Sequence, residues 1–368
     1  MAELSRRIAV IPGDGIGPEV IGEAVAVLET LDRLFSLGLQ FEIFPWGAEH
    51  YLATGETLPE GAVERLQTEF GSILLGAMGD PRVPDMAHAR DIVLGLRRRL
   101  DLFVNQRPIR LLDDRLGPLK GKGAEDIDFV ILRENTEGCY VGCGGWFKRG
   151  TPDEVAIEES VNTRTGVERI IRYAFEMALA YGYGRVTMAD KSNAIRFGHD
   201  LWYRVFQEVG ADYPDVEMQH LYIDVLAAEV LRAPEQFEVI VTCNLFGDIL
   251  ADLAAQLMGG LGLAASANLH PTRVSLFEPV HGSAPKLAGQ GFANPVAAIL
   301  CVQLLLGHLG LLEQGILIER AVIAALREGV TTPDLGGSHT TTQVGNWIRE
   351  RIEIEAAGGG AGSVGGEG

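Results

Sequence analysis

The sequence predicts an α/β protein with more than one domain or lobe, and three observations carry this prediction. Short apolar runs of the length of buried strands alternate with longer stretches of helical periodicity. The 368 residues exceed what one hydrophobic core usually holds, and 47% of them are apolar. The glycines at 13, 15 and 17 follow the first apolar run but do not match G-x-G-x-x-G, so a Rossmann domain is not expected.

The expected elements follow one another in a regular order along the chain. Apolar runs bounded by glycine, proline or asparagine predict strands or extended segments at 8–11, 73–77, 128–132, 185–189, 221–224 and 237–242. Stretches with apolar residues three and four apart predict helices at 24–34, 87–100, 167–181, 195–209, 225–231 and 245–257.

Composition excludes several classes of function. The net charge of −19 argues against nucleic acid and against anionic membrane surfaces as partners. The apolar stretch 295–312 is barely long enough to span a bilayer and contains Gln303 and His308, so we interpret it as a buried helix. No targeting segment is evident. The four cysteines have no zinc or redox spacing and indicate reduced thiols in a cytoplasmic protein: Cys139, Cys143, Cys243 and Cys301.

Two aspartates near a helix start are the first candidates for chemistry. Asp248 and Asp252 are four residues apart, so both carboxylates project from one face of the predicted helix. Such a pair could simply complement the helix macrodipole. Carboxylate oxygens are also the ligands that Mg²⁺ and Mn²⁺ prefer. Because two carboxylates are too few for a cage made by protein alone, a metal here would be held jointly with an anionic substrate.

Three arginines could supply the site for that anion. Arg97 lies on the helix 87–100, Arg107 in a turn before an extended segment, and Arg133 at the end of the strand 128–132. Guanidinium groups bind carboxylates through paired hydrogen bonds, although the sequence does not establish that these three converge. Val93 and Leu94 share the helix face of Arg97, which suits a carboxylate with a short apolar branch.

Two further segments complete the candidates. Lys191 follows the strand 185–189 and is either a solvated residue or, close to a metal and arginines that would lower its pKa, a base. The segment 274–295 is polar and rich in glycine, which suits a loop that wraps a nucleotide with its backbone.

Taken together and in their order along the chain, the motifs of this sequence resemble those of the metal-dependent β-decarboxylating dehydrogenases. These enzymes act on 3-isopropylmalate, isocitrate, homoisocitrate, tartrate or D-malate. The resemblance covers roughly residues 6–355. Its motifs are IPGDGIG from Ile11, Leu96-Arg97 with Arg107-Pro108, RENTEG from Arg133, KSN from Lys191, NLFGDILAD from Asn244 and EPVHGSAP from Glu278.

The resemblance implies a fold and an assembly. The fold would be an isopropylmalate dehydrogenase-like open mixed sheet shared by two lobes, unlike a Rossmann fold. The first lobe would comprise residues 1–102 and 258–355 and the second lobe residues 103–257, with 356–368 as a disordered glycine-rich tail. The chain would form a homodimer in which Lys191 and Asp224 enter the active site of the partner subunit.

The resemblance also implies the role of each site residue. Arg97, Arg107 and Arg133 would bind the substrate carboxylates. Mg²⁺ or Mn²⁺ would be bound by Asp224, Asp248 and Asp252. Lys191 would take the proton of the C2 hydroxyl group, and Tyr140 would protonate the enolate that remains after loss of CO₂. NAD, with NADP as the alternative, would lie along Glu278, His281, Gly282, Ser283, Ala284, Pro285, Lys286, Asn294 and Asp334.

The implied reaction is the oxidative decarboxylation of a 2-hydroxy acid that carries a 3-carboxylate. Val93 and Leu94 favour 3-isopropylmalate, converted to 2-oxoisocaproate in leucine biosynthesis. Arg90 could instead meet a third carboxylate, and the RENTEG motif also resembles other branches, so tartrate, D-malate, homoisocitrate and isocitrate remain alternatives. A catalytically inactive regulatory subunit is the non-enzymatic alternative, but none of the catalytic groups is lost.

Two departures from the family pattern concern the base and the nucleotide. Asp190 stands where a histidine usually precedes the lysine, so the basicity of Lys191 could differ from that of the family's lysine. Lys286 stands where NAD-using members carry aspartate, and its charge alone would favour the 2′-phosphate of NADP. Because its usual partner residues are missing at Leu287, Pro333 and Gly337, we expect NAD to be preferred with poor discrimination.

Overall fold

One continuous ten-stranded sheet forms the centre of the protein. The computed structural model describes residues 4–359. Its strand order is β2-β1-β3-β12-β11-β4-β5-β10-β8-β9. The strands are β1 (Arg7–Ile11), β2 (Gln40–Ile43), β3 (Ser72–Leu75), β4 (Val104–Arg110), β5 (Asp128–Glu134), β8 (Arg185–Asp190), β9 (Glu217–Tyr222), β10 (Val239–Thr242), β11 (Ala265–Leu269) and β12 (Ser275–Pro279). The predicted α/β class with an open mixed sheet is confirmed.

The two halves of the sheet run in opposite directions. β4 is antiparallel to both β5 and β11, and β11 is antiparallel to β12, whereas the other pairings of this sheet are parallel. The strands expected in the first lobe make up one half and those expected in the second lobe the other. β4 and β11 join the halves, and the lobe boundaries themselves stay a prediction.

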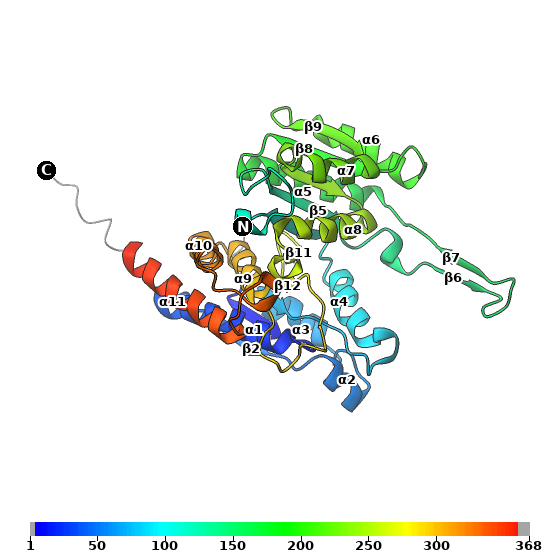
Figure 1. Ribbon diagram of the computed structural model, residues 1–368. Coiled ribbons are helices and arrows are strands. Elements are labelled where there is room, and N and C mark those ends of the chain that lie inside the picture. The colour runs from blue at the N-terminus through cyan, green and yellow to red at the C-terminus, as the bar shows by residue number, and fades with distance from the viewer. Residues whose placement is uncertain (1–3, 360–368) are drawn as a thin grey trace.

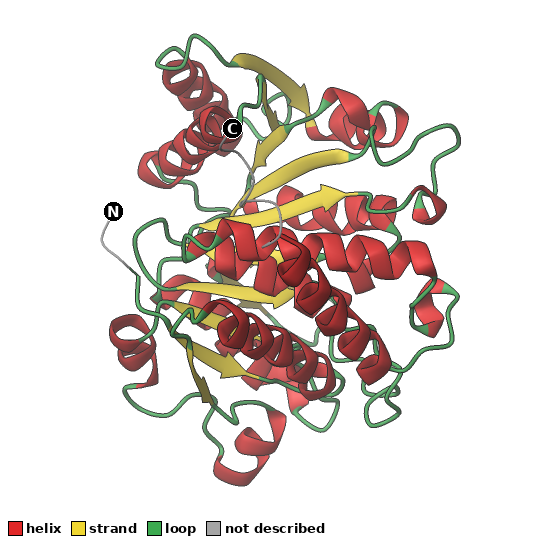
Figure 2. Cartoon of the chain, turned by 90° about the vertical axis from the view of Figure 1, so that its left-hand side faces the viewer, coloured by secondary structure: helices red, strands yellow, loops and turns green. Residues whose placement is uncertain are grey.

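Helices pack along both halves (Figure 1), and Figure 2 shows them in front of the sheet and behind it. They are α1 (Gly17–Phe35), α2 (Ala48–Thr54), α3 (Ala62–Glu69), α4 (Ala87–Arg99), α5 (Arg164–Tyr181), α6 (Gly198–Gly210), α7 (Ile223–Arg232), α8 (Asn244–Ala255), α9 (Val296–His308), α10 (Leu312–Glu328) and α11 (Thr341–Gly359). The predicted buried helix at 295–312 corresponds to α9, and nine of its residues are buried. Among the described residues, no helix is long and apolar enough to cross a membrane.

A separate hairpin projects from the second half of the sheet (Figure 1). Its strands are β6 (Gly144–Phe147) and β7 (Val155–Glu158), paired antiparallel. Both strands are exposed along their whole length. Trp146 is 63% exposed and Ile157 is 55% exposed. A hairpin with large apolar side chains in solvent is typical of a segment that packs against another chain.

The structure corrects three local expectations. Arg107 lies within β4 and not in a turn. Asp224 is not extended but occupies the first turn of α7, which begins one residue earlier. α11 continues to Gly359, so residues 356–359 of the expected disordered tail are helical. The rest of that tail, 360–368, lies outside the described residues.

Candidate active site

Three buried guanidinium groups converge where β4, β5 and α4 meet. Arg97 comes from α4, Arg107 from β4 and Arg133 from β5. Arg97 and Arg107 are each 7% exposed, and Arg133 is 2% exposed. Burying like charges together is costly, and it lowers the pKa of Arg107 through desolvation and the charge of Arg97. Desolvation and Arg97 likewise lower the pKa of Arg133 to about 10.

Two N–H groups of this cluster have no hydrogen-bond partner among the described residues. They are Nε of Arg97 and Nη1 of Arg107, both buried. A buried donor without an acceptor costs free energy, so an anionic ligand that accepts from these groups would be favoured. The convergence that the sequence left open is therefore present, together with free donors for a carboxylate.

A polar network behind the arginines fixes their direction. Nη2 of Arg97 donates to Oε1 of Glu278 at 2.8 Å, and Nη1 is 3.4 Å from Oδ1 of Asn135. Nε of Arg107 donates to Asn105 at 2.9 Å. Asn268 links Glu278, Asn105 and Asn135 through bonds of 2.7–2.9 Å. Burial raises the pKa of Glu278, but Arg97 and its hydrogen bonds outweigh burial, so the net pKa is lowered and the carboxylate stays ionised.

Sequence reasoning placed Glu278 on the nucleotide, which stays a prediction, and did not foresee that Glu278 pairs with Arg97. It also missed the asparagines of this network. Asn135 lies inside the RENTEG motif, which was a usable signal. Asn105 and Asn268 sit in β4 and β11 without any local pattern, and only the pairing of these strands brings them together.

The aspartates of α8 lie beside the arginines. Nη1 of Arg133 forms an ion pair with Oδ1 of Asp248, and Nε donates to Oδ1 of Asn244 at 2.8 Å. The hydroxyl group of Tyr140 donates to Oδ2 of Asp248 at 2.8 Å. Burial and the Asp248 carboxylate raise the pKa of Asp252, although Arg107 opposes them. No hydrogen bond or ion pair of the Asp252 carboxylate occurs within residues 4–359.

Tyr140 is placed to hold a proton next to this cluster. It lies in the short 3₁₀ segment Cys139–Val141 that follows β5. Burial, together with its bond to Asp248, raises the pKa of Tyr140 to about 12. The phenol is therefore neutral over the whole physiological range and can act as a proton donor.

Lys191 and Asp224 form a pair of their own. Nζ of Lys191 donates to Oδ1 of Asp224 at 2.6 Å, and both side chains are partly open to solvent. This pair lowers the pKa of Asp224. Within the described part of the chain, no group of three or more histidines, cysteines, aspartates or glutamates is arranged to hold a metal ion. One chain thus does not bring Asp224 together with Asp248 and Asp252 as a metal site.

The predicted nucleotide residues group around the turn after β12. Nδ2 of Asn294 donates to Asp334 at 3.0 Å, and the Asp334 charge acts on His281. Burial lowers the pKa of His281, and its Nε2 has no partner among the described residues. The loop Gly282–Pro285 is partly exposed, and Lys286 at its end is exposed without a salt bridge in residues 4–359.

The glycine-rich turn after β1 packs directly on this loop. The N–H of Ile16 donates to the carbonyl oxygen of Ser283 at 2.8 Å. Gly15 has φ +58°, and a Cβ there would lie 2.0 Å from that oxygen, so only glycine fits. Asp14 of the same turn accepts from Gly79 at 2.7 Å and contacts buried His88 of α4 at 2.8 Å. Sequence reasoning named neither Asp14 nor His88 as a site residue.

Leu94 and Val93 have different surroundings. Leu94 lines a small hollow with Arg97, Asn135 and Tyr140. Val93 packs partly buried against the apolar cluster beneath α4. Leu94 is therefore placed beside the arginine cluster, whereas no such contact is found for Val93 in the described structure.

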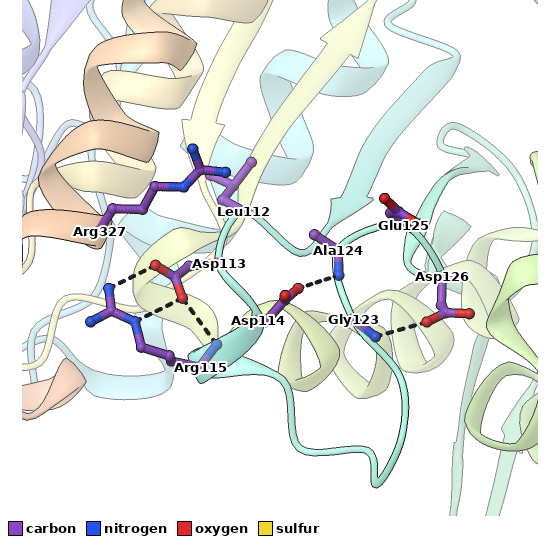
Figure 3. A pocket seen from close by; sticks show the side chains of 9 residues that line it. All are labelled: Leu112, Asp113, Asp114, Arg115, Gly123, Ala124, Glu125, Asp126 and Arg327. Atoms are coloured by element: carbon purple, nitrogen blue, oxygen red, sulfur yellow. Dashed lines mark hydrogen bonds and ion pairs between the residues drawn. The ribbon is translucent and has the colours of Figure 1, made fainter.

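A larger hollow of about 660 Å³ lies elsewhere (Figure 3). Its three aspartates are bound within the chain: Asp113 pairs with Arg115, and Asp114 and Asp126 accept from the backbone at Ala124 and Gly123. This hollow contains none of the predicted site residues, and its aspartates stabilise the segment between β4 and β5.

Comparisons with known proteins agree with this geometry. The sequence model of the isocitrate/isopropylmalate dehydrogenase family matches residues 7–348. The 3-isopropylmalate dehydrogenase of Thermobifida fusca is 46% identical over 96% of this chain and 99% of its own length. That of Nocardia farcinica is 48% identical over 94% of this chain and 100% of its own length.

Solved structures of similar fold are dehydrogenases of the same kind. The isocitrate dehydrogenase of Methylococcus capsulatus superposes with a TM-score of 0.85 at 35% identity, covering 94% of this chain and 99% of that one. A β-decarboxylating dehydrogenase of Thermococcus kodakarensis superposes with a TM-score of 0.79 at 36% identity, over 98% and 99% of the two chains. The family expected from the motifs is confirmed: this chain belongs to the isocitrate/isopropylmalate dehydrogenase family and is a decarboxylating dehydrogenase.

Proposed function

We propose that this enzyme oxidises and decarboxylates 3-isopropylmalate to 2-oxoisocaproate, a step of leucine biosynthesis, with NAD and Mg²⁺ or Mn²⁺. The observation that carries the proposal is the cluster of three buried guanidiniums with two unpartnered donors. Glu278 and Asp248 pair with Arg97 and Arg133, and the two unpartnered donors favour a further anion. A malate derivative brings two carboxylates that can accept from them. The relatives named 3-isopropylmalate dehydrogenase support the choice of substrate.

The side chains divide the work as follows. Arg97, Arg107 and Arg133 hold the substrate carboxylates and orient C2. Lys191 takes the proton of the C2 hydroxyl group while the hydride leaves. Tyr140, kept neutral by its raised pKa, delivers a proton to C3 after CO₂ has departed.

The residues present fit a divalent cation and a nicotinamide dinucleotide. Asp248 and Asp252 offer hard oxygen donors. Burial and the Asp248 charge raise the pKa of Asp252, so a bound cation would stabilise its ionised form. Asp224 would add a third carboxylate. When bound, the cation supplies Lewis acidity at the C2 oxygen, and the nicotinamide accepts the hydride.

For the dinucleotide, the loop after β12 offers groups that need a partner. Nε2 of His281 is buried without one, and Ser283, Asn294 and Asp334 lie around the same turn. Exposed Lys286 would contribute only about 0–1 kcal/mol toward a 2′-phosphate, so NAD remains the preferred nucleotide in our proposal.

Leu94 supports an apolar 3-substituent. It lines the hollow with Arg97 and Tyr140, so a branched alkyl group on C3 would meet it. Arg90, the residue that could instead meet a third carboxylate, is exposed on α4. A tricarboxylate such as isocitrate is therefore the second candidate.

We further propose a cytoplasmic homodimer with shared sites. The pair Lys191–Asp224 stands apart from Asp248 and Asp252 in one chain, which agrees with each pair completing the site of the other subunit. The exposed apolar side chains of the β6–β7 hairpin, and exposed Ile249 on α8, offer the surface such a dimer needs.

The test is the absorbance of reduced nicotinamide formed with Mn²⁺ and a panel of malate derivatives, with Arg107→Ala as the inactive control. We expect turnover with 3-isopropylmalate and none in the control. If no derivative is oxidised by the parent chain, the proposed function fails, and an inactive regulatory subunit of this family takes its place.

A further inference from the structure

Asp190 is a carboxylate at the end of β8 with no exposed surface, directly before Lys191. Its Oδ1 accepts the backbone N–H of Ser192 at 3.0 Å and the Ser192 hydroxyl group at 3.1 Å. Nε2 of His220, on the neighbouring strand β9, lies 3.0 Å from the same oxygen. Burying a carboxylate is expensive unless it is bound in this way. Three contacts to Oδ1 thus offset the cost of burying the Asp190 carboxylate.

These bonds fix the backbone on both sides of Lys191. The N–H of Lys191 donates to Nδ1 of His199 at 3.0 Å, and the next N–H, that of Ser192, is held by Asp190. Burial lowers the pKa of His199, so its ring stays neutral and can accept. Both peptide N–H groups that flank the base are therefore held by buried side chains.

His220 extends this support to the side chain of Lys191. Its ring packs edge-on against Tyr203 and Tyr222, with centroids 4.9 Å and 5.3 Å apart. Nζ of Lys191 lies 5.8 Å from the ring centroid of Tyr222 and donates to Asp224. Asp190 pairs with Tyr222 in the β8–β9 register, so His220 is its diagonal neighbour, within reach of a long side chain.

We propose that Asp190 and His220 are positioning residues that act through Lys191. Asp190 holds the turn at Lys191 and Ser192, and His220 holds the ring of Tyr222. Together they fix the position of the Lys191 ammonium group, which lies beside that ring. Asp190 Oδ2 is buried without a partner among the described residues, a cost that a turn serving stability alone would not require. This inference rests on the proposed role of Lys191 as the base of the reaction.

Three variants test it in the full-length enzyme. Asp190→Ala removes the turn bonds, Asp190→Asn keeps an acceptor oxygen, and His220→Phe keeps the ring but loses the bond to Asp190. We expect kcat to fall roughly 10- to 100-fold in Asp190→Ala and His220→Phe, because a base displaced by about 1 Å loses that much. The KM for substrate should stay within a few-fold, and Asp190→Asn should recover part of the loss.

A control on the same strands separates positioning from stability. Thr187 is buried in β8 and its hydroxyl group donates to Gln219 of β9 at 2.8 Å, away from Lys191. Thr187→Val removes one cross-strand side-chain bond and should leave kcat unchanged. The isotope effect on kcat with substrate deuterated at C2 should rise in His220→Phe but not in Thr187→Val. Unchanged kcat in both Asp190→Ala and His220→Phe, or an equal loss in Thr187→Val, would overturn the proposal.

Subunit exchange separates this inference from the function it rests on. Mixed Lys191→Ala and Arg107→Ala chains should regain activity in the one intact site of each heterodimer. Mixed Asp190→Ala and Arg107→Ala chains should regain it equally, because the intact site then contains Lys191 with its Asp190. Recovery in the first mixture alone would refute the role of Asp190. Recovery in neither would refute the shared site, and the kinetics of the single variants would then decide on Asp190.

Discussion

Glu278→Gln tests the electrostatics of the arginine cluster. In the parent, Glu278 pairs with Arg97 at 2.8 Å, and the side chains are 11% and 8% exposed. Breaking a buried ion pair costs about 3–5 kcal/mol. Because glutamine keeps an oxygen that can accept from Arg97 and Asn268, we expect the lower end, about 3 kcal/mol of unfolding free energy.

The assay is equilibrium unfolding in denaturant at one fixed protein concentration, since a dimer's stability depends on concentration. Glu353→Gln is the matched control, because Glu353 pairs with Arg33 at the surface, and its loss should cost about 0–1 kcal/mol. A dicarboxylate substrate should stabilise Glu278→Gln at least as much as the parent, since the variant cluster has one more net positive charge. Equal costs for the two variants would refute the reasoning.

The pH dependence of this pair has a definite sign. The pKa of Glu278 is lowered on folding, so its stabilisation is complete above the ordinary glutamate pKa of about 4.3. It is lost as the pH falls through the lowered folded value. The difference in stability between parent and Glu278→Gln should therefore be constant near neutral pH and shrink in acid.

Three further predictions concern the catalytic groups and the nucleotide. Tyr140→Phe should lower kcat roughly 10²- to 10⁴-fold while substrate binding, measured by calorimetry, persists, because only the proton donor is lost; an active variant would exclude Tyr140 as the acid. Mixing inactive Lys191→Ala and Arg107→Ala chains should restore activity, and no recovery despite proven exchange would mean that each site belongs to one chain. Lys286→Asp should lower kcat/KM for NADP and leave kcat/KM for NAD nearly unchanged, since a carboxylate repels the 2′-phosphate. A much higher kcat/KM for NADP than for NAD in the parent would contradict our interpretation of Lys286.

Much of the fold could be predicted because its signals are local. The buried strands at 8–11, 128–132 and 185–189 and the helices after them are visible as apolar periodicity. Arg107 was misplaced for a local reason too. Pro108 cannot donate a ladder bond and is typical of turns, yet here it pairs with Val130 inside the sheet.

The rest depends on contacts between distant segments. The motifs identified the arginines and aspartates, but not that Glu278 would turn to Arg97, 181 residues away. The burial of Asp190 was equally invisible, since its partner His220 is 30 residues further on and meets it only through the β8–β9 pairing. Strand register creates these contacts, and a linear pattern of residue types does not encode it.

The most direct test of the account compares kcat/KM for 3-isopropylmalate with the values for D-malate, tartrate, homoisocitrate and isocitrate. Burial of the branched alkyl group beside Leu94 should contribute about 1.5–3 kcal/mol, a preference over D-malate of roughly 10- to 150-fold. Leu94→Ala should reduce this preference while D-malate turnover changes little. A higher kcat/KM for any of the other four substrates would contradict the account.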